Sequence, residues 1–251
     1  MPLVDWVLGS LLLGLRIAPV LGFAPPFTLS RTPPIFRLLL GLGLAGLITA
    51  WRPPIFAGGE VDAGWLLAAA GRELFVGLVF VTGLQLMFGA IYLAGRTVDV
   101  QAGFGLAGLI DPTSSAQIPL VGSFLAYLAG AIFFAMDGHL ELLRLLAATV
   151  DAAPIGTASP PASLAQLTSL LGAVMAISLG VTGGAILALF LADVAITMMS
   201  RTVPQMNVLM LGFQVKTLLL LIVLPLSAGV WGALLTRLAR VTLEGLPRLL
   251  T

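Results

Sequence analysis

The sequence predicts an all-α integral membrane protein of about six long apolar helices, arranged as helical hairpins. Hydrophobic residues make up 59% of its 251 residues and the mean hydropathy is +1.11, far above the values of soluble globular domains. The apolar residues also gather in runs of about 20, the length that crosses a bilayer core of ~30 Å. Charged residues are scattered singly and sum to +1, so no basic tract for nucleic acid exists. Cysteine is absent, which removes disulfides and thiolate chemistry.

Proline, glycine and charged residues separate the apolar runs, because proline lacks an amide proton and disfavours helix in the preceding residue. The first run has neither a basic start nor a small-residue cleavage site, so we expect it to be retained as a membrane segment. The expected helices cover residues 6–23, 35–51, 64–94, 118–136 with an amphipathic extension to 150, 164–192 and 215–236. Two of these exceed one bilayer crossing, which favours tilted helices or a larger assembly. Orientation stays open, because the C-terminal arginines contradict the charge bias of the other loops.

Several ionisable residues lie inside or beside the apolar runs, where a charge costs ~2.5 to 3.5 kcal/mol and normally faces protein or water. They include Glu73, Asp99, Asp193 and Arg201, and Arg96 lies at i,i+3 helical spacing from Asp99. For Arg96 and Asp193, a plain interfacial position at a helix end is at least as well supported. We expect Glu73 to join helices or to line a polar path.

Small residues recur at four-residue spacing in two of the predicted helices. Gly122, Ala126 and Gly130 form one stripe, and Gly180 and Gly184 begin another. Small side chains let membrane helices approach closely, so both stripes predict helix packing. The alternative is that glycine is simply frequent in membrane helices.

No enzymatic or metal-binding motif is convincing. Glycine patterns at 41–46 and 103–108 match the dinucleotide fingerprint but lack the strand before and the helix after that it requires. His139, Asp137 and Glu141 offer few ligands for a metal ion, because the chain has one histidine and no cysteine. We therefore expect no enzyme, no cofactor and no metal site.

The stretch from residue 99 to 119 concentrates Asp, Gln, Ser, Gly and Pro in an otherwise apolar chain. Its Asp111-Pro112 pair must break a helix. Irregular backbone at membrane depth is tolerated only where protein buries it or a water-filled cavity lies beside it. The stretch therefore predicts a re-entrant loop or a loop inside a pore, with a plain surface loop as the alternative.

At this point the residues resemble a known family. Asp99-x-Gln101-x-Gly103-Phe104, followed by Asp111-Pro112 and Gln117-x-Pro119, resembles the flagellar branch of the FliR/SctT family of type III secretion export-gate subunits. Later landmarks of the resemblance follow in the right order: Asp137, Gly138, His139, residues 154–156, Arg201, Pro204, Gln205, Asn207, residues 212–213 and Lys216. The resemblance covers nearly the whole chain.

The resemblance implies a multi-pass protein of the bacterial inner membrane at the flagellar basal body, without enzymatic activity. One copy would join several FliP-like and FliQ-like subunits in a tilted helical assembly. An FlhB-like export subunit and membrane lipid would be further partners. Unfolded flagellar proteins would leave through its pore. Residues 1–153 would be FliP-like, and residues 162–251 would be a FliQ-like helical hairpin.

The resemblance also implies a pore plug at about residues 103–119, in agreement with the polar, bendable loop expected above. In this interpretation apolar side chains seal the pore and hydroxyl and amide groups satisfy nearby backbone. The predicted plug residues are Leu106, Leu109, Ile110, Asp111, Pro112, Ser114, Ser115, Gln117, Ile118 and Pro119.

One position departs from the family pattern. Gln214 stands where the family usually has proline, directly after Phe213. Because glutamine supplies the amide proton that proline lacks, the last helix is expected to begin earlier.

The alternative function is a solitary secondary transporter or channel. Glu73, Asp99, Asp193 and Arg201 would then form an intramembrane ion or substrate site. Against it, six segments are few and the two halves lack matching broken helices.

Overall fold

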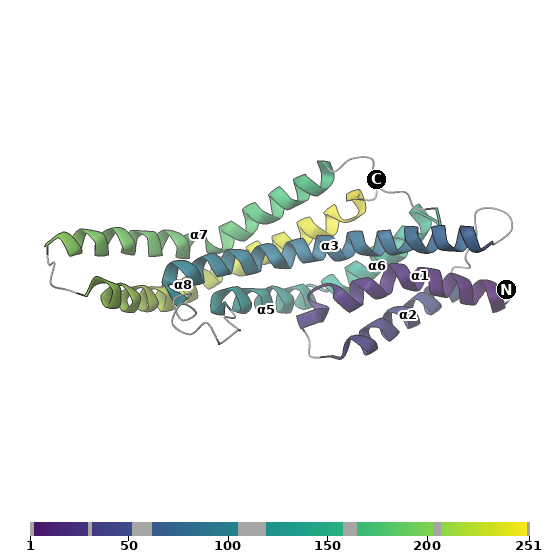
Figure 1. Ribbon diagram of the computed structural model, residues 1–251, viewed down its shortest axis with the longest axis horizontal. Coiled ribbons are helices and arrows are strands. Elements are labelled where there is room, and N and C mark those ends of the chain that lie inside the picture. Colours follow the sequence, from purple (N-terminus) through teal and green to yellow (C-terminus); the bar gives the residue numbers. More distant parts are fainter. Residues whose placement is uncertain are drawn as a thin grey trace. The chain divides into compact units, whose positions relative to one another are not determined.

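The computed structural model describes residues 3–29, 32–51, 62–104, 119–157, 165–202 and 207–249. Within these ranges the chain is helical and contains no β-strand, which confirms the predicted all-α class (Figure 1). Its elements are α1 (Leu3–Phe23), η1 (Phe27–Leu29), α2 (Pro34–Trp51), α3 (Ala63–Ala102), α5 (Leu120–Ala135), α6 (Gly138–Ala152), α7 (Ala165–Thr202), α8 (Val208–Gly245) and η3 (Pro247–Leu249).

Five of the described helices, α1, α2, α3, α7 and α8, are long and apolar enough to cross a membrane. Counting α5 and α6 together as one broken span gives six, the number that the sequence predicts. With 40 residues, α3 measures about 60 Å along its axis, twice a bilayer core. α3, α7 and α8 extend furthest beyond their predicted bounds, α3 and α7 mainly at their C-terminal ends and α8 at both ends.

Two helix boundaries bear on the sequence predictions. α8 begins at Val208, so Gln214 lies inside the helix and the predicted early start is confirmed. The helix expected to run from residue 118 to 150 is instead divided into α5 and α6, and the amphipathic part is a separate helix. The division falls at Asp137, whose φ of 58° is left-handed and incompatible with a continuous helix.

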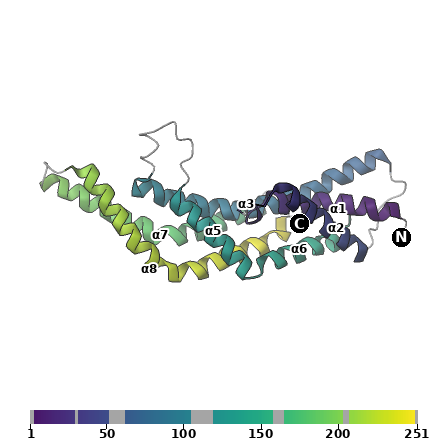
Figure 2. The same cartoon turned by 90° about the horizontal axis from the view of Figure 1, so that it is seen from below.

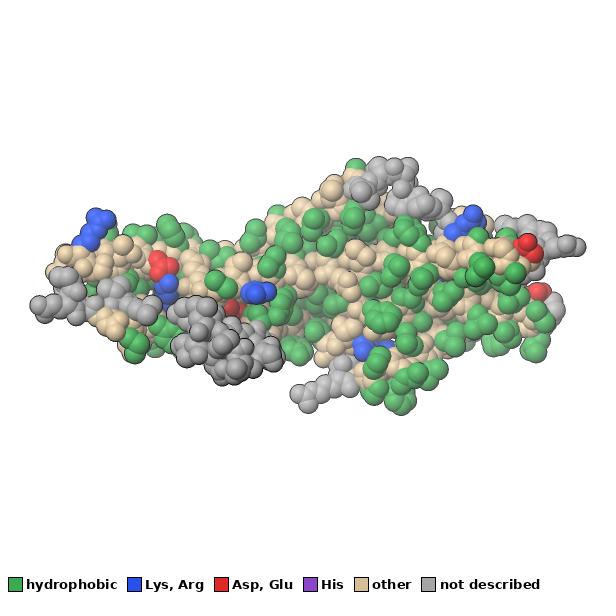
Figure 3. Space-filling view, in the orientation of Figure 1, with side chains coloured by type: hydrophobic (Ala, Val, Ile, Leu, Met, Phe, Trp, Pro, Cys, Tyr) green, Lys and Arg blue, Asp and Glu red, His purple; other side chains and the backbone are tan. Residues whose placement is uncertain are grey.

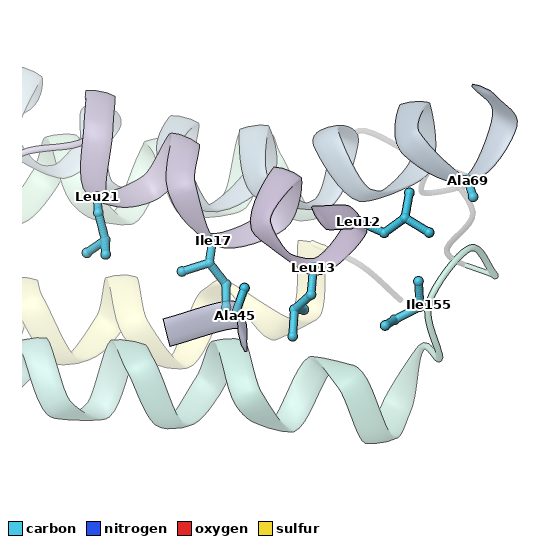
Figure 4. Close-up of a cluster of buried hydrophobic side chains, with 7 residues drawn as sticks. All are labelled: Leu12, Leu13, Ile17, Leu21, Ala45, Ala69 and Ile155. Atoms are coloured by element: carbon cyan, nitrogen blue, oxygen red, sulfur yellow. The ribbon is translucent and has the colours of Figure 1, made fainter. Parts of the chain in front are cut away.

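The chain divides into two compact units. Unit 1 contains residues 1–87, 133–172 and 239–251, and unit 2 contains residues 88–132 and 173–238. In unit 1, α1 is the central element: 61% of the residues in its most apolar stretch are buried, against 17% for α2. Its apolar side chains form a core with α2, α3 and the chain after α6 (Figure 4), built from Leu12, Leu13, Ile17, Leu21, Ala45, Ala69 and Ile155.

Close backbone approaches hold the helices of unit 1 together. α1 and α2 lie side by side as a hairpin in both views (Figures 1 and 2). A Cβ atom on Gly41 would lie 2.6 Å from the Cα of Ala18, and one on Gly77 would lie 2.6 Å from the carbonyl oxygen of Arg16. Only glycine fits at these crossings of α1 with α2 and α3, as expected for packed membrane helices.

In unit 2, a buried indole joins α7 and α8. The Trp231 Nε1 donates to the carbonyl oxygen of Val181 at 3.1 Å. Outside this contact the two helices carry many large exposed apolar side chains, including Leu187, Phe190 and Leu226. Hydrophobic side chains likewise cover much of the face in Figure 3. An apolar surface of this extent belongs against lipid or other membrane subunits.

Candidate functional site

The predicted plug lies almost entirely outside the described residues, but the chain on both sides of it is described. α3 ends at Ala102, and Gly103 follows with a φ of 90°, a left-handed conformation that favours glycine at a helix end. The Phe104 ring then packs edge-on against Phe213 of α8, with ring centroids 6.2 Å apart. On the far side, Pro119 directly precedes α5.

Asp99 connects the two sides of this segment. Its Oδ1 accepts the amide proton of Val121 at 3.0 Å and its Oδ2 accepts that of Gly122 at 3.1 Å. These amides belong to the first turn of α5, which has no partners for them within the helix and carries a partial positive charge. The Asp99 side chain is therefore a buried cap for α5, supplied by the last turns of α3.

The same two helices cross at minimal distance. A Cβ atom on Gly95 would lie 2.5 Å from the Cα of Gly122, and one on Gly122 would lie 2.8 Å from the carbonyl oxygen of Tyr92. Gly122, predicted as a packing residue, thus lies at an α3–α5 crossing where no larger residue fits. Gly130, from the same stripe, is buried.

The second predicted stripe faces outward within this chain. Gly180 and Gly184 are exposed, and a Cβ on either would meet nothing nearer than 3.8 Å. Their packing role therefore stays a prediction about a neighbouring subunit.

Lys216 joins three helices of unit 2. Its Nζ lies 2.5 Å from Asp193 Oδ1 of α7 and donates to the backbone carbonyl of Gln101 at 3.1 Å. Gln101 is in the last turn of α3, where carbonyls lack intrahelical partners and attract a cation. The Gln101 side chain donates to the carbonyl oxygen of Ile186 at 3.3 Å. Lys216 and Gln101, both residues of the family motifs, thus link the end of α3 to α7 and α8.

The Asp137-Gly138-His139 landmark forms the turn between α5 and α6. The Asp137 carbonyl accepts the amide protons of Leu140 and Glu141, which starts α6. A Cβ on Gly138 would lie 2.8 Å from the Phe133 ring, so the turn requires glycine. The His139 ring packs 5.3 Å from that of Phe134.

The remaining landmark residues lie around the α7–α8 connection. Arg201 is exposed in the last turn of α7, where a cation suits the helix dipole. The Asn207 Oδ1 accepts the amide proton of Met210 at 3.2 Å, which caps the start of α8. Pro204 and Gln205 lie outside the described residues.

Glu73 takes part in a buried polar network of unit 1. Its carboxylate makes a bidentate pair with Arg16, with Nε–Oε2 at 2.6 Å and Nη2–Oε1 at 3.0 Å, and neither side chain is exposed to any extent. Glu73 Oε1 also accepts the amide proton of Gly156 at 2.8 Å. Arg16 donates further to Thr149 Oγ1 at 2.8 Å and to the Ala153 carbonyl at 3.1 Å. Glu73 therefore joins helices, one of its two predicted roles.

Sequence reasoning missed Arg16 as the partner of Glu73. Arg16 is the only charged residue in the middle of the first apolar run, which was the available signal. A charge in the middle of one apolar helix favours pairing with an opposite charge on a neighbouring helix, here Glu73, because an unpaired charge at that depth is costly.

These contacts weaken the transporter alternative. Glu73 and Asp99 are already satisfied by Arg16, Gly156 and the start of α5, and Asp193 pairs with Lys216. Among the residues that the structure describes, no group of three or more His, Cys, Asp or Glu side chains is placed to hold a metal ion.

Comparison with known proteins adds an independent finding. The model of the family described as bacterial export proteins, family 1, matches residues 7–241. The chain is 27% identical to the flagellar biosynthetic protein FliR of Bacillus subtilis, over 99% of this chain and 96% of the relative. It is 30% identical to FliR of Pectobacterium carotovorum over 85% of this chain and 81% of the relative. It is also 30% identical to the Yop proteins translocation protein T of Yersinia pestis, over 63% and 62%.

Proposed function

This chain belongs to family 1 of the bacterial export proteins, the FliR/SctT family of type III export, and from that premise we propose that it is a subunit of the flagellar export gate. The match of the family model over residues 7–241 carries the proposal. Of the three relatives compared above, the two flagellar proteins match more of this chain, 99% and 85% against 63%, which favours flagellar export over injection of virulence proteins.

The gate that we propose contains one copy of this chain with FliP-like and FliQ-like subunits, beside an FlhB-like subunit in the bacterial inner membrane at the basal body. Its cargo is unfolded flagellar protein. The large apolar side chains exposed on α7 and α8 support such an assembly, because they need lipid or subunit partners. We propose no catalytic role and no cofactor for the chain.

We propose further that residues 1–153 correspond to a FliP-like part and residues 162–251 to a FliQ-like hairpin. In support, α6 ends at Ala152 and α7 begins at Ala165, so the boundary falls between helices. α7 and α8, with 38 residues each, then form a pair of long helices joined by the Trp231 contact.

We propose that residues 103–119 plug the pore. Supporting this, the described residues on either side are held firmly: Asp99 caps α5, Gly95 and Gly122 cross closely, and Lys216 holds the end of α3. A plug requires such fixed ends, because a segment that closes a pore must return to one position after cargo passes.

The test is deletion of residues 107–117 in a strain that carries the companion subunits. We expect assembled gate complexes at the parental level, because the contacts among α3, α5 and α8 remain. We also expect the membrane to become permeable to small solutes. Parental permeability in an assembled complex would overturn the plug, and failure of the parental chain to join any complex would overturn the gate assignment.

A further inference from the structure

The buried network around Glu73 contains more polar contacts than joining two helices requires. Arg16 of α1 and Glu73 of α3 already satisfy each other as a bidentate pair. Yet both also reach the chain at the end of α6: Arg16 donates to Thr149 Oγ1 and the Ala153 carbonyl, and Glu73 accepts from the Gly156 amide. The ion pair therefore also hydrogen-bonds to the end of α6 and to the backbone that follows it.

The neighbouring residue Arg72 completes the hold on that connection. Its Nη1 donates to the carbonyl oxygen of Gly156 at 2.6 Å. Consecutive residues of α3 therefore bind both backbone polar groups of one residue, with Glu73 on its amide and Arg72 on its carbonyl. We call Arg16, Arg72 and Glu73 together the Gly156 clasp.

Gly156 itself fits only as glycine. Its φ is 79°, in the left-handed region, and a Cβ atom would lie 3.1 Å from both the Ala69 Cβ and the Trp65 ring. The adjacent Ile155 is buried in the core of unit 1 with 2% of its surface exposed. Side-chain packing and backbone hydrogen bonds therefore fix the same short stretch, residues 153–157.

Stability alone does not account for the buried charges. Replacing a buried ion pair by apolar residues of similar volume is often neutral or stabilising, because desolvation offsets the attraction between the charges. In some proteins, a buried ion pair with directed hydrogen bonds instead restricts the groups that it binds to one arrangement. Here those groups include the backbone at which the N-terminal part of the chain ends.

We propose that Arg16, Arg72 and Glu73 are positioning residues that fix the point from which the C-terminal hairpin departs. This inference rests on the proposed gate function. The hairpin of α7 and α8 takes its place among companion subunits only if residues 153–157 are held against α1 and α3. Loss of the clasp therefore lowers incorporation of the chain into the gate before it lowers the amount of folded chain.

The first experiment removes the surface-exposed member of the clasp. Arg72 is exposed, so Arg72→Met should leave folding intact while it frees the Gly156 carbonyl. Arg144→Met is the matched control, because Arg144 is an exposed arginine of α6 whose contact is with Glu141. At equal chain abundance, we expect Arg72→Met to lower the amount of assembled gate at least about threefold, and the control and Arg72→Lys to stay near the parental level.

A second variant, Arg16→Met with Glu73→Met, removes both buried charges together. We expect it to accumulate in the membrane but to assemble about tenfold less than the parent. Should it fail to accumulate, Arg72→Met alone decides the question. Parental assembly and export by either accumulating variant would overturn the inference, whereas a parental chain that joins no complex would instead overturn the gate assignment.

Thiol labelling gives a direct measure of position. The chain has no cysteine, so Ile155→Cys places its only thiol at the buried side of the clasp. With Arg72 intact, we expect a maleimide to react slowly, and with Arg72→Met about tenfold faster, because local opening exposes the thiol. Equal rates in the two backgrounds would show that the clasp does not hold this stretch.

Discussion

Asp99 accepts two buried amide protons from the first turn of α5, and its replacement by alanine would leave both without a partner. Each unsatisfied buried donor costs about 1 to 3 kcal/mol, so Asp99→Ala should lower the free energy of unfolding by about 2 to 6 kcal/mol. Asp99→Asn keeps one acceptor oxygen and loses the charge, so about half of that loss is expected.

Asp62, which directly precedes α3, supplies a control for a solvent-exposed helix cap. Its Oδ1 accepts a single amide proton, from Trp65 at the exposed start of α3, at 2.7 Å. An exposed cap of this kind is worth about 0.5 to 2 kcal/mol, because water can replace the lost acceptor. Asp62→Ala should therefore destabilise the protein clearly less than Asp99→Ala.

The assay is reversible unfolding of the purified protein in mixed micelles of a mild detergent with increasing SDS, followed by circular dichroism and tryptophan fluorescence. From most to least stable, we expect the order parent, Asp62→Ala, Asp99→Asn, Asp99→Ala. Equal unfolding free energies for Asp99→Ala and Asp62→Ala would show that burial and the second hydrogen bond do not make the Asp99 cap more stabilising than the Asp62 cap.

Three further predictions concern packing and charge. Gly95→Val should destabilise the chain by about 1 to 3 kcal/mol in the same unfolding assay, whereas Gly89→Val, where a Cβ meets nothing within 4 Å, should change it little; equal effects would contradict the close crossing. Arg16→Met alone should cost about 3 to 5 kcal/mol because Glu73 stays buried without its partner, and adding Glu73→Met should recover part of it; additive losses would contradict coupling. Lys216→Met should lower the free energy of unfolding by about 1 to 2 kcal/mol, and Lys216→Arg should retain most of the parental stability. A Lys216→Met protein as stable as the parent would show that the contacts of Lys216 with α3 and α7 do not stabilise the fold.

Hydropathy alone predicted the fold class and about six helices long and apolar enough to cross a membrane, because apolar runs of bilayer length are rare in soluble proteins. The helix ends were less predictable. α3 continues eight residues past its predicted end at residue 94, since Arg96 and Asp99 are compatible with helix once their side chains find partners or solvent. The break at Asp137 was missed because it depends on a left-handed backbone conformation, and no proline at this position indicates that the helix ends.

The candidate site was predicted in part. The motif around Asp99 and Gln101 was identified, but the i,i+3 spacing of Arg96 and Asp99 did not indicate that Asp99 caps α5. That contact joins residues 22 positions apart and depends on tertiary packing, which helical spacing does not report. Arg16 was missed for the same reason, as its partner Glu73 is 57 residues away.

Membership of an export gate is tested by the native mass of this protein after mild detergent extraction, expressed alone and then with FliP-like and FliQ-like subunits. We expect one large complex that contains a single copy of this chain and forms only on co-expression. A stable monomer or homo-oligomer whose mass is unchanged by those subunits would contradict it.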